Sequence, residues 1–142
     1  MREELRQRLA NEYSYAVTKM RETPQAIQKL FYFSVLFGEA QRILNLEWSS
    51  ELALIHLVTR YVHTQVNNTL QTPGLAQTLP VDWTAVINKL IQVSSDLATY
   101  FEKSGNKGNK EELCRILEGF AEVEYAVSGN GSYLYEKGAF KL

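Results

Sequence analysis

The sequence contains one cysteine, Cys114, and only three prolines among its 142 residues. A lone cysteine excludes an internal disulfide and any cysteine-rich metal site. The longest apolar stretch, residues 30–37, is interrupted by Ser34 and is far too short to cross a bilayer. The first residues are charged and include no apolar run, so we expect no signal peptide. These features predict a cytoplasmic protein that does not associate with membranes.

The chain also has almost no net charge and none of the common catalytic motifs. The sequence has fifteen lysines and arginines and sixteen aspartates and glutamates, which gives a formal charge of −1. No global field therefore favours nucleic acid or an acidic membrane surface, and such binding would need a local patch. We find no glycine-rich phosphate loop, no zinc-protease motif and no nucleophile elbow. The sequence thus predicts no catalytic residue, no metal and no cofactor, and it favours a non-enzymatic protein.

What the chain does contain is helical periodicity. Hydrophobic residues make up 45% of the sequence and charged residues 22%, as in ordinary globular proteins. The length suits a single domain, 1–142. Apolar residues recur at helical spacing in five segments, approximately residues 2–22, 24–46, 50–70, 83–103 and 109–127. We therefore predict an all-α fold, an antiparallel, up-and-down bundle of about five helices in which sequence neighbours pack together. Residues 128–142 are expected to form a short irregular tail, either flexible or part of an interface.

Polar residues at the breaks predict where these helices begin. Thr23 followed by Pro24 is a typical start for the second helix. A serine at position 49 or 50 is expected to cap the third helix, and Asp82 the fourth. Asn109, with Glu112 three residues later, has the pattern of a capping box for the fifth.

The second predicted helix is the most apolar segment of the chain. Large apolar side chains surround most of it and leave only a narrow polar strip, so we expect it to be the central helix of the bundle, with a second subunit covering any part that the bundle leaves exposed. Glu39 and Arg42 lie off that strip and either pair locally or reach a partner. Two tyrosines alternate with a leucine in the C-terminal tail, which suits an extended segment without a partner in this chain. The interface candidates are therefore Phe31, Phe33, Phe37, Tyr133 and Tyr135.

A second candidate surface lies on the third predicted helix. His56, Arg60, His63 and Asn67 follow one another at intervals of four, three and four residues, which places them along one helical stripe. Such a stripe offers donors and positive charge to a phosphate group. Two histidines could also act as general base and general acid in metal-independent RNA cleavage. The alternative is that these residues form the ordinary solvated face of a surface helix.

The sequence therefore favours a helical interaction or adaptor module that associates with itself or docks into a larger complex. The alternative is an accessory protein that binds RNA or DNA through His56, Arg60, His63 and Asn67. A ribonuclease that uses the two histidines is the third and least favoured possibility.

Overall fold

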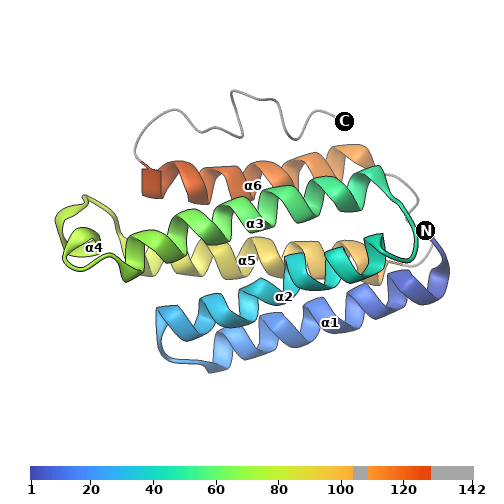
Figure 1. Ribbon diagram of the computed structural model, residues 1–142, viewed down its shortest axis with the longest axis horizontal. Coiled ribbons are helices and arrows are strands. Elements are labelled where there is room, and N and C mark those ends of the chain that lie inside the picture. Colours follow the sequence, from blue (N-terminus) through green and yellow to red (C-terminus); the bar gives the residue numbers. More distant parts are fainter. Residues whose placement is uncertain (104–108, 129–142) are drawn as a thin grey trace.

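The computed structural model describes residues 1–103 and 109–128, and the regular secondary structure within them is entirely helical. The prediction of an all-α fold is therefore confirmed. The helices are α1 (Glu3–Glu22), α2 (Ala26–Leu44), α3 (Ser50–Gln71), α4 (Leu75–Thr78), α5 (Trp83–Glu102) and α6 (Lys110–Ser128). The count differs from the predicted five because α4, a single turn, forms within a segment that reads as a loop (Figure 1). Tyr133 and Tyr135 lie outside the described residues.

The five long helices pack as a ring in which the order differs from the order along the chain. α1 packs against α2 and α5, α3 packs against α2 and α6, and α5 packs against α6. α6 therefore lies between α3 and α5, although those two helices are successive long helices in the sequence. The expectation that sequence neighbours always pack together is wrong at this point. The segment between α3 and α5, which includes α4, is long enough to carry the chain past the position that α6 occupies.

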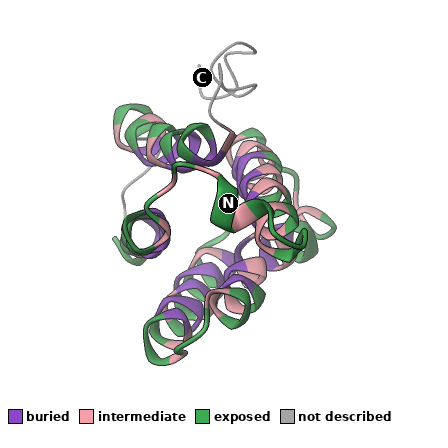
Figure 2. Ribbon diagram, turned by 90° about the vertical axis from the view of Figure 1, so that its left-hand side faces the viewer, coloured by how far each residue is buried: buried purple, intermediate pink, exposed green. Residues whose placement is uncertain are grey.

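Each long helix turns one apolar side toward a shared core (Figure 2). Tyr13 of α1 is fully buried, and its hydroxyl donates a 2.7 Å hydrogen bond to the carbonyl of Leu36 in α2. Phe33 of α2 and Phe120 of α6 are also fully buried, with ring centroids 5.9 Å apart. Aromatic side chains from three helices thus fill the interior, where their large apolar area contributes strongly to stability.

Three of the four predicted helix starts are confirmed. Ser49 accepts a hydrogen bond from the amide of Leu52 at 3.2 Å, and Asp82 accepts one from Ala85 at 3.1 Å. The side-chain oxygen of Asn109 accepts a bond from the amide of Glu112 at 3.1 Å. The start of α2 differs, because its N-cap residue is Gln25 and no side chain caps it.

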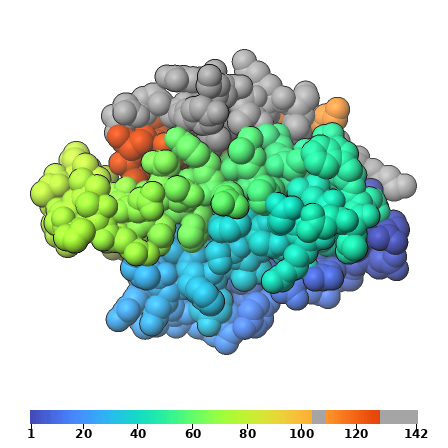
Figure 3. Space-filling model, viewed as in Figure 1, coloured from blue at the N-terminus to red at the C-terminus, as the bar shows by residue number. Residues whose placement is uncertain are grey.

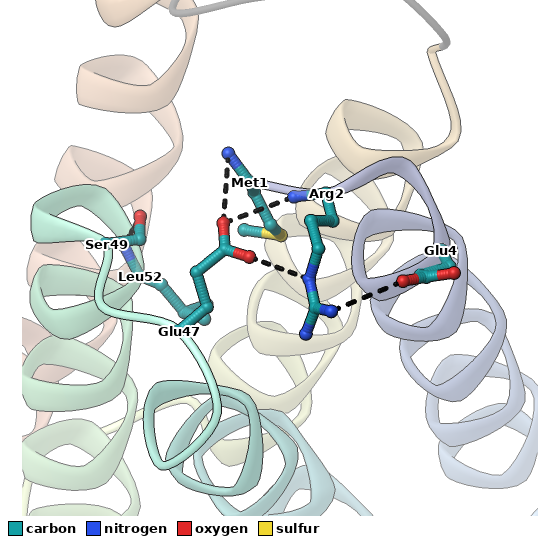
Figure 4. Close-up of polar contacts among 6 residues, drawn as sticks. All are labelled: Met1, Arg2, Glu4, Glu47, Ser49 and Leu52. Atoms are coloured by element: carbon teal, nitrogen blue, oxygen red, sulfur yellow. Dashed lines mark hydrogen bonds and ion pairs between the residues drawn. The ribbon is translucent and has the colours of Figure 1, made fainter.

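Glu47 ties the connection between α2 and α3 to the beginning of α1 (Figure 4). Its Oε2 accepts a 3.0 Å bond from the guanidinium of Arg2, while its Oε1 lies 3.2 Å from the Arg2 amide and 3.4 Å from the amino group of Met1. Desolvation raises the pKa of Glu47, but hydrogen bonds from the Met1 amino group and from Arg2 outweigh it, so the pKa is lowered. The carboxylate therefore stays charged and joins two segments that are distant in sequence.

Candidate interaction surface

The histidines of the α3 stripe lie along its contact with α2. His63 stacks on Phe33, with centroids 6.2 Å apart and ring planes at 6°. Phe37 lies against both histidines, with its centroid 5.2 Å from that of His63 and 6.5 Å from that of His56. The four rings form a continuous row between the two helices, so the histidines have a structural role in the α2–α3 contact.

This position keeps both histidines in their neutral form at pH 7. Burial lowers the pKa of His63, and the hydrogen bond with the backbone of Leu30, which acts in the opposite direction, does not compensate. Burial also lowers the pKa of His56, and the nearby positive charge of Arg60 lowers it further. Since an ordinary histidine titrates near pH 6.5, both rings are largely uncharged at neutral pH. Of the stripe residues, only Arg60 then supplies a fixed positive charge.

The other two members of the stripe are polar side chains outside this row of rings. Arg60 is exposed, and among the described residues its guanidinium forms no ion pair. Asn67 is half-buried, and its side-chain oxygen accepts a 2.9 Å hydrogen bond from Gln71 one turn later in α3. The stripe therefore combines two ring contacts with two polar side chains and does not present four free donors.

The three phenylalanines of α2 have different surroundings, although they lie within one short segment. Phe33 is fully buried, so it belongs to the core and is not available to a partner. Phe37 is half-buried between the histidines. Phe31, by contrast, leaves 69% of its surface exposed. Among the interface candidates on α2, only Phe31 presents most of its side chain to solvent.

The side of α2 that carries Phe31 has no charged residue between Ile27 and Gly38, and the exposed Arg42 follows one turn later. Ile27, one turn earlier, is 42% exposed, and Ser34 and Gly38 continue the same side of the helix at helical spacing. The Ser34 hydroxyl donates to the carbonyl of Phe31. Apart from Gly38's two chain neighbours and the adjacent backbone of α2, no atom of the described residues lies within 4 Å of the place that a Cβ at Gly38 would occupy. α2 lies at the molecular surface in the view of Figure 3. We refer to Ile27, Phe31, Ser34 and Gly38 as the outward face of α2.

Glu39 lies beside this face but is buried, with an exposed fraction of 1%. Its carboxylate accepts hydrogen bonds from Arg8 of α1 and from Arg42, the latter at 3.0 Å. The local pair with Arg42 is one of the two possibilities that the sequence left open. The bond from Arg8 joins two helices, and no local spacing could have predicted it.

The outer side of the α5–α6 contact forms a shallow groove with mixed charge. Lys103 forms an ion pair with Glu112 at 3.1 Å, and Lys89 forms one with Glu122. Neighbouring opposite charges neutralise each other there, so the groove has no dominant sign. Within residues 1–103 and 109–128, no three histidine, cysteine or acidic side chains are grouped as a metal site.

Comparisons with known proteins provide no further guidance: no family model matches the chain, and no curated protein or solved structure matches it either. In the described part of the chain, no helix has the length and apolar character needed to cross a membrane. The function must therefore be argued from the surface geometry.

Proposed function

We propose that this protein is a non-enzymatic helical interaction module that associates with a protein partner, or with itself, through the outward face of α2. The observation that carries the proposal is the exposure of Phe31, of which 69% remains in contact with water, beside a partly exposed Ile27. Burying one such side chain contributes about 1.5–3 kcal/mol. Aromatic side chains that become buried at the centre of an interface commonly dominate binding.

The proposal includes the arrangement and the location of the module. In Figure 1 the chain reverses its direction between successive long helices, which supports an up-and-down bundle, although the neighbours α3 and α6 run in the same direction. Such a bundle holds α2 as a rigid element, because α1 and α3 pack on its two sides. A rigid, preformed helix loses little conformational entropy on binding. We place this module in the cytoplasm, as expected from its single cysteine.

Affinity-tagged protein expressed in its native cell tests the proposal. We expect the wild-type protein to retain a partner chain, or an untagged copy of itself, in stoichiometric amount. The Phe31→Ser variant should lose it, because the variant removes the largest exposed apolar group of the face. Trp48→Ser is the matched control, since Trp48 is 73% exposed but lies in the α2–α3 connection. Equal retention by wild type and Phe31→Ser would contradict the proposal.

Binding of RNA or DNA is the second candidate, and Arg60 is the feature that favours it. The guanidinium is exposed and unpaired among the described residues, and guanidinium groups bind phosphate well. This function predicts binding to a labelled oligonucleotide that weakens steeply with salt and is lost in Arg60→Ala. The neutral state of His56 and His63 counts against it, because it removes two of the three expected positive charges.

A further inference from the structure

We infer that residues 129–142, the C-terminal tail, turn back along α6 and dock on the outer side of the contact between α3 and α6. This surface belongs to other helices than the outward face of α2, so the inference goes beyond the proposed function and does not depend on it. It follows from the apolar side chains on that side of the bundle, from the reach of the tail and from the charges on α6.

One half of this surface is a stripe on α3. Leu54, Leu57 and Tyr61 follow one another at intervals of three and four residues, so they share one side of the helix. That side is turned away from His56 and His63, which contact α2. Because α3 packs on α2 and on α6, the stripe borders α6. Leu57 leaves 51% of its surface exposed.

The other half is a stripe on α6. Cys114, Ala121 and Tyr125 follow one another at intervals of seven and four residues. Gly119, which lies against α5, is on the other side of the helix. Because α6 packs on α5 and on α3, the stripe borders α3, and its Tyr125 is 49% exposed. We refer to Leu54, Leu57, Tyr61, Cys114 and Tyr125 as the α3–α6 face.

The tail starts at one end of this face and is long enough to cover it. α6 ends at Ser128, has 19 residues and is about 28 Å long. The eleven residues 132–142 span about 36 Å when they are extended. Gly129 and Gly131 have no Cβ, so the backbone can reverse its direction between them.

The tail also has the side chains that an apolar surface requires. Its large apolar and aromatic residues are Tyr133, Leu134, Tyr135, Phe140 and Leu142. Burial of such side chains, the aromatic ones above all, contributes strongly to stability. A tethered segment has an effective concentration of roughly millimolar, so a contact too small to hold a separate molecule is sufficient to hold the tail. Tyr133 and Tyr135 then have their partner within the chain.

The charges of the tail fit those of α6. Its two lysines, Lys137 and Lys141, outnumber its one acidic side chain. Glu111 and Glu118 are exposed on α6, three residues before and four residues after Cys114. Within residues 1–103 and 109–128, neither glutamate forms an ion pair. Attraction between these opposite charges favours a tail that lies along α6.

Ring contacts in the core fix which residues lie side by side. Phe33 contacts both His63 of α3 and Phe120 of α6, so these two lie at about the same level of the bundle. The two helices run in the same direction (Figure 1). Leu57, six residues before His63, is therefore level with a point about 21 Å before the end of α6. An extended chain covers this distance in about six residues after the reversal, which places Lys137 beside Leu57.

Disulfide cross-linking of the full chain tests this position. In a Cys114→Ser background, Leu57→Cys and Lys137→Cys should form a disulfide within one chain on mild oxidation, detected by peptide mass spectrometry. Glu122→Cys with Lys137→Cys is the matched control. Glu122 is exposed and nearer the end of α6, but it is on the side that pairs with Lys89 of α5. We expect the control pair to link several-fold more slowly.

Two further tail positions allow for a shift of register. Tyr135→Cys and Ala139→Cys are each paired with Leu57→Cys and with Glu122→Cys in the same way. If no tail position links faster to Leu57→Cys than to Glu122→Cys, the tail does not dock on the α3–α6 face and the inference is wrong. Disulfides that form between chains, in proportion to protein concentration, also overturn it, because the occupant is then the tail of a second copy.

A double-mutant cycle measured by urea denaturation gives an independent test. Leu57→Ser and Tyr135→Ser should each lower the free energy of unfolding, because either change releases the tail. Their combined loss should therefore be smaller than the sum of the two single losses. Trp48→Ser with Tyr135→Ser is the control and should be additive, since Trp48 is 73% exposed but lies in the α2–α3 connection. Additive losses for Leu57→Ser and Tyr135→Ser would overturn the inference.

Discussion

Two glutamates with the same burial have opposite surroundings. Glu39 and Glu124 are each 1% exposed. The carboxylate of Glu39 is bonded by two arginines, whereas Oε2 of Glu124 has no hydrogen-bond partner within the described residues. A carboxylate oxygen that is buried without a partner loses its hydration and gains no hydrogen bond in return, which lowers stability. Glu124 is thus a position at which this sequence is not optimal for folding.

Replacing Glu124 with methionine should therefore stabilise the protein. Methionine has a similar volume and removes the unsatisfied oxygen, so we expect the free energy of unfolding to rise by about 1–3 kcal/mol. Urea denaturation at pH 7 measures this difference. Glu118→Met, on the exposed side of the same helix, is the control and should change stability little. A lower stability for Glu124→Met would show that the carboxylate has a partner in solution.

His63 should make stability depend on pH. Its pKa is lowered in the folded protein from an ordinary value of 6.5. Below pH 6.5 the unfolded chain takes up a proton that the folded chain does not, so stability falls as the pH is lowered toward the folded-state pKa and is constant beyond it. We expect urea midpoints to be lower at pH 5.5 than at pH 7.5. In His63→Phe this difference should shrink, with the remainder due to His56, whose pKa is also lowered. If the difference between the two urea midpoints is the same in His63→Phe as in the wild type, the pH dependence of stability does not come from His63.

At the scale of the helix, two glycines illustrate how packing decides the role of a residue. Gly38 of α2 faces open space in the described structure, whereas a methyl group on Gly119 of α6 would lie 2.9 Å from a Cγ atom of Val93 in α5. Glycine at position 119 therefore lets α5 and α6 approach closely. At position 38, where the space is open, glycine has no such packing role, and it weakens α2 because it is a poor helix former.

Alanine at these two positions should have opposite effects. Gly38→Ala should raise the free energy of unfolding by about 1 kcal/mol, the difference in helix propensity. Gly119→Ala should lower it by about 1 kcal/mol, because overpacking against Val93 exceeds the same gain in propensity. Thermal melts at low protein concentration measure both. Val93→Ala should suppress the loss caused by Gly119→Ala, and additive effects of those two changes would contradict the steric explanation.

At the scale of the whole molecule, core contacts join helices that are not neighbours in the bundle as well as those that are. Phe33 of α2 and Phe120 of α6 are in ring contact, although α2 and α6 are not among the extensively packed pairs. Phe33 also stacks on His63 of α3. A change at Phe33 should thus be felt by two other helices, which suits a bundle that unfolds as one cooperative unit.

A double-mutant cycle tests this coupling. Phe33→Leu and Phe120→Leu should each cost about 1 kcal/mol, and the double variant should differ from their sum by at least about 0.5 kcal/mol. Denaturant unfolding provides the energies. Phe33→Leu combined with Phe101→Leu is the control, because Phe101 makes its ring contacts with Tyr13 and Tyr100 instead. If the free-energy changes are additive in both cycles, the contact between Phe33 and Phe120 does not couple α2 to α6.

Local patterns predicted the helices well, and they predicted the surface of α2 poorly. The core positions of α5 and α6 could be read from their spacing, because each of these helices has one apolar side and one polar side. Phe31 and Phe33 could not be told apart, because α2 is apolar nearly all round and both belong to one run. Ile27 gave no separate signal for the same reason. The histidine stripe was visible as a stripe, but its contact with Phe33 and Phe37 was not.

The sequence by itself determined that this chain is helical, where most of its helices begin and which side of the amphipathic ones is buried. These properties depend on residues within a few turns of one another, through backbone hydrogen bonds, capping and the periodicity of apolar side chains. Only the tertiary structure decided that α6 lies between α3 and α5, that Arg8 reaches Glu39, and that Phe31 faces solvent while Phe33 is buried. Those outcomes depend on contacts between residues distant in sequence, and no local spacing specifies which helices come together.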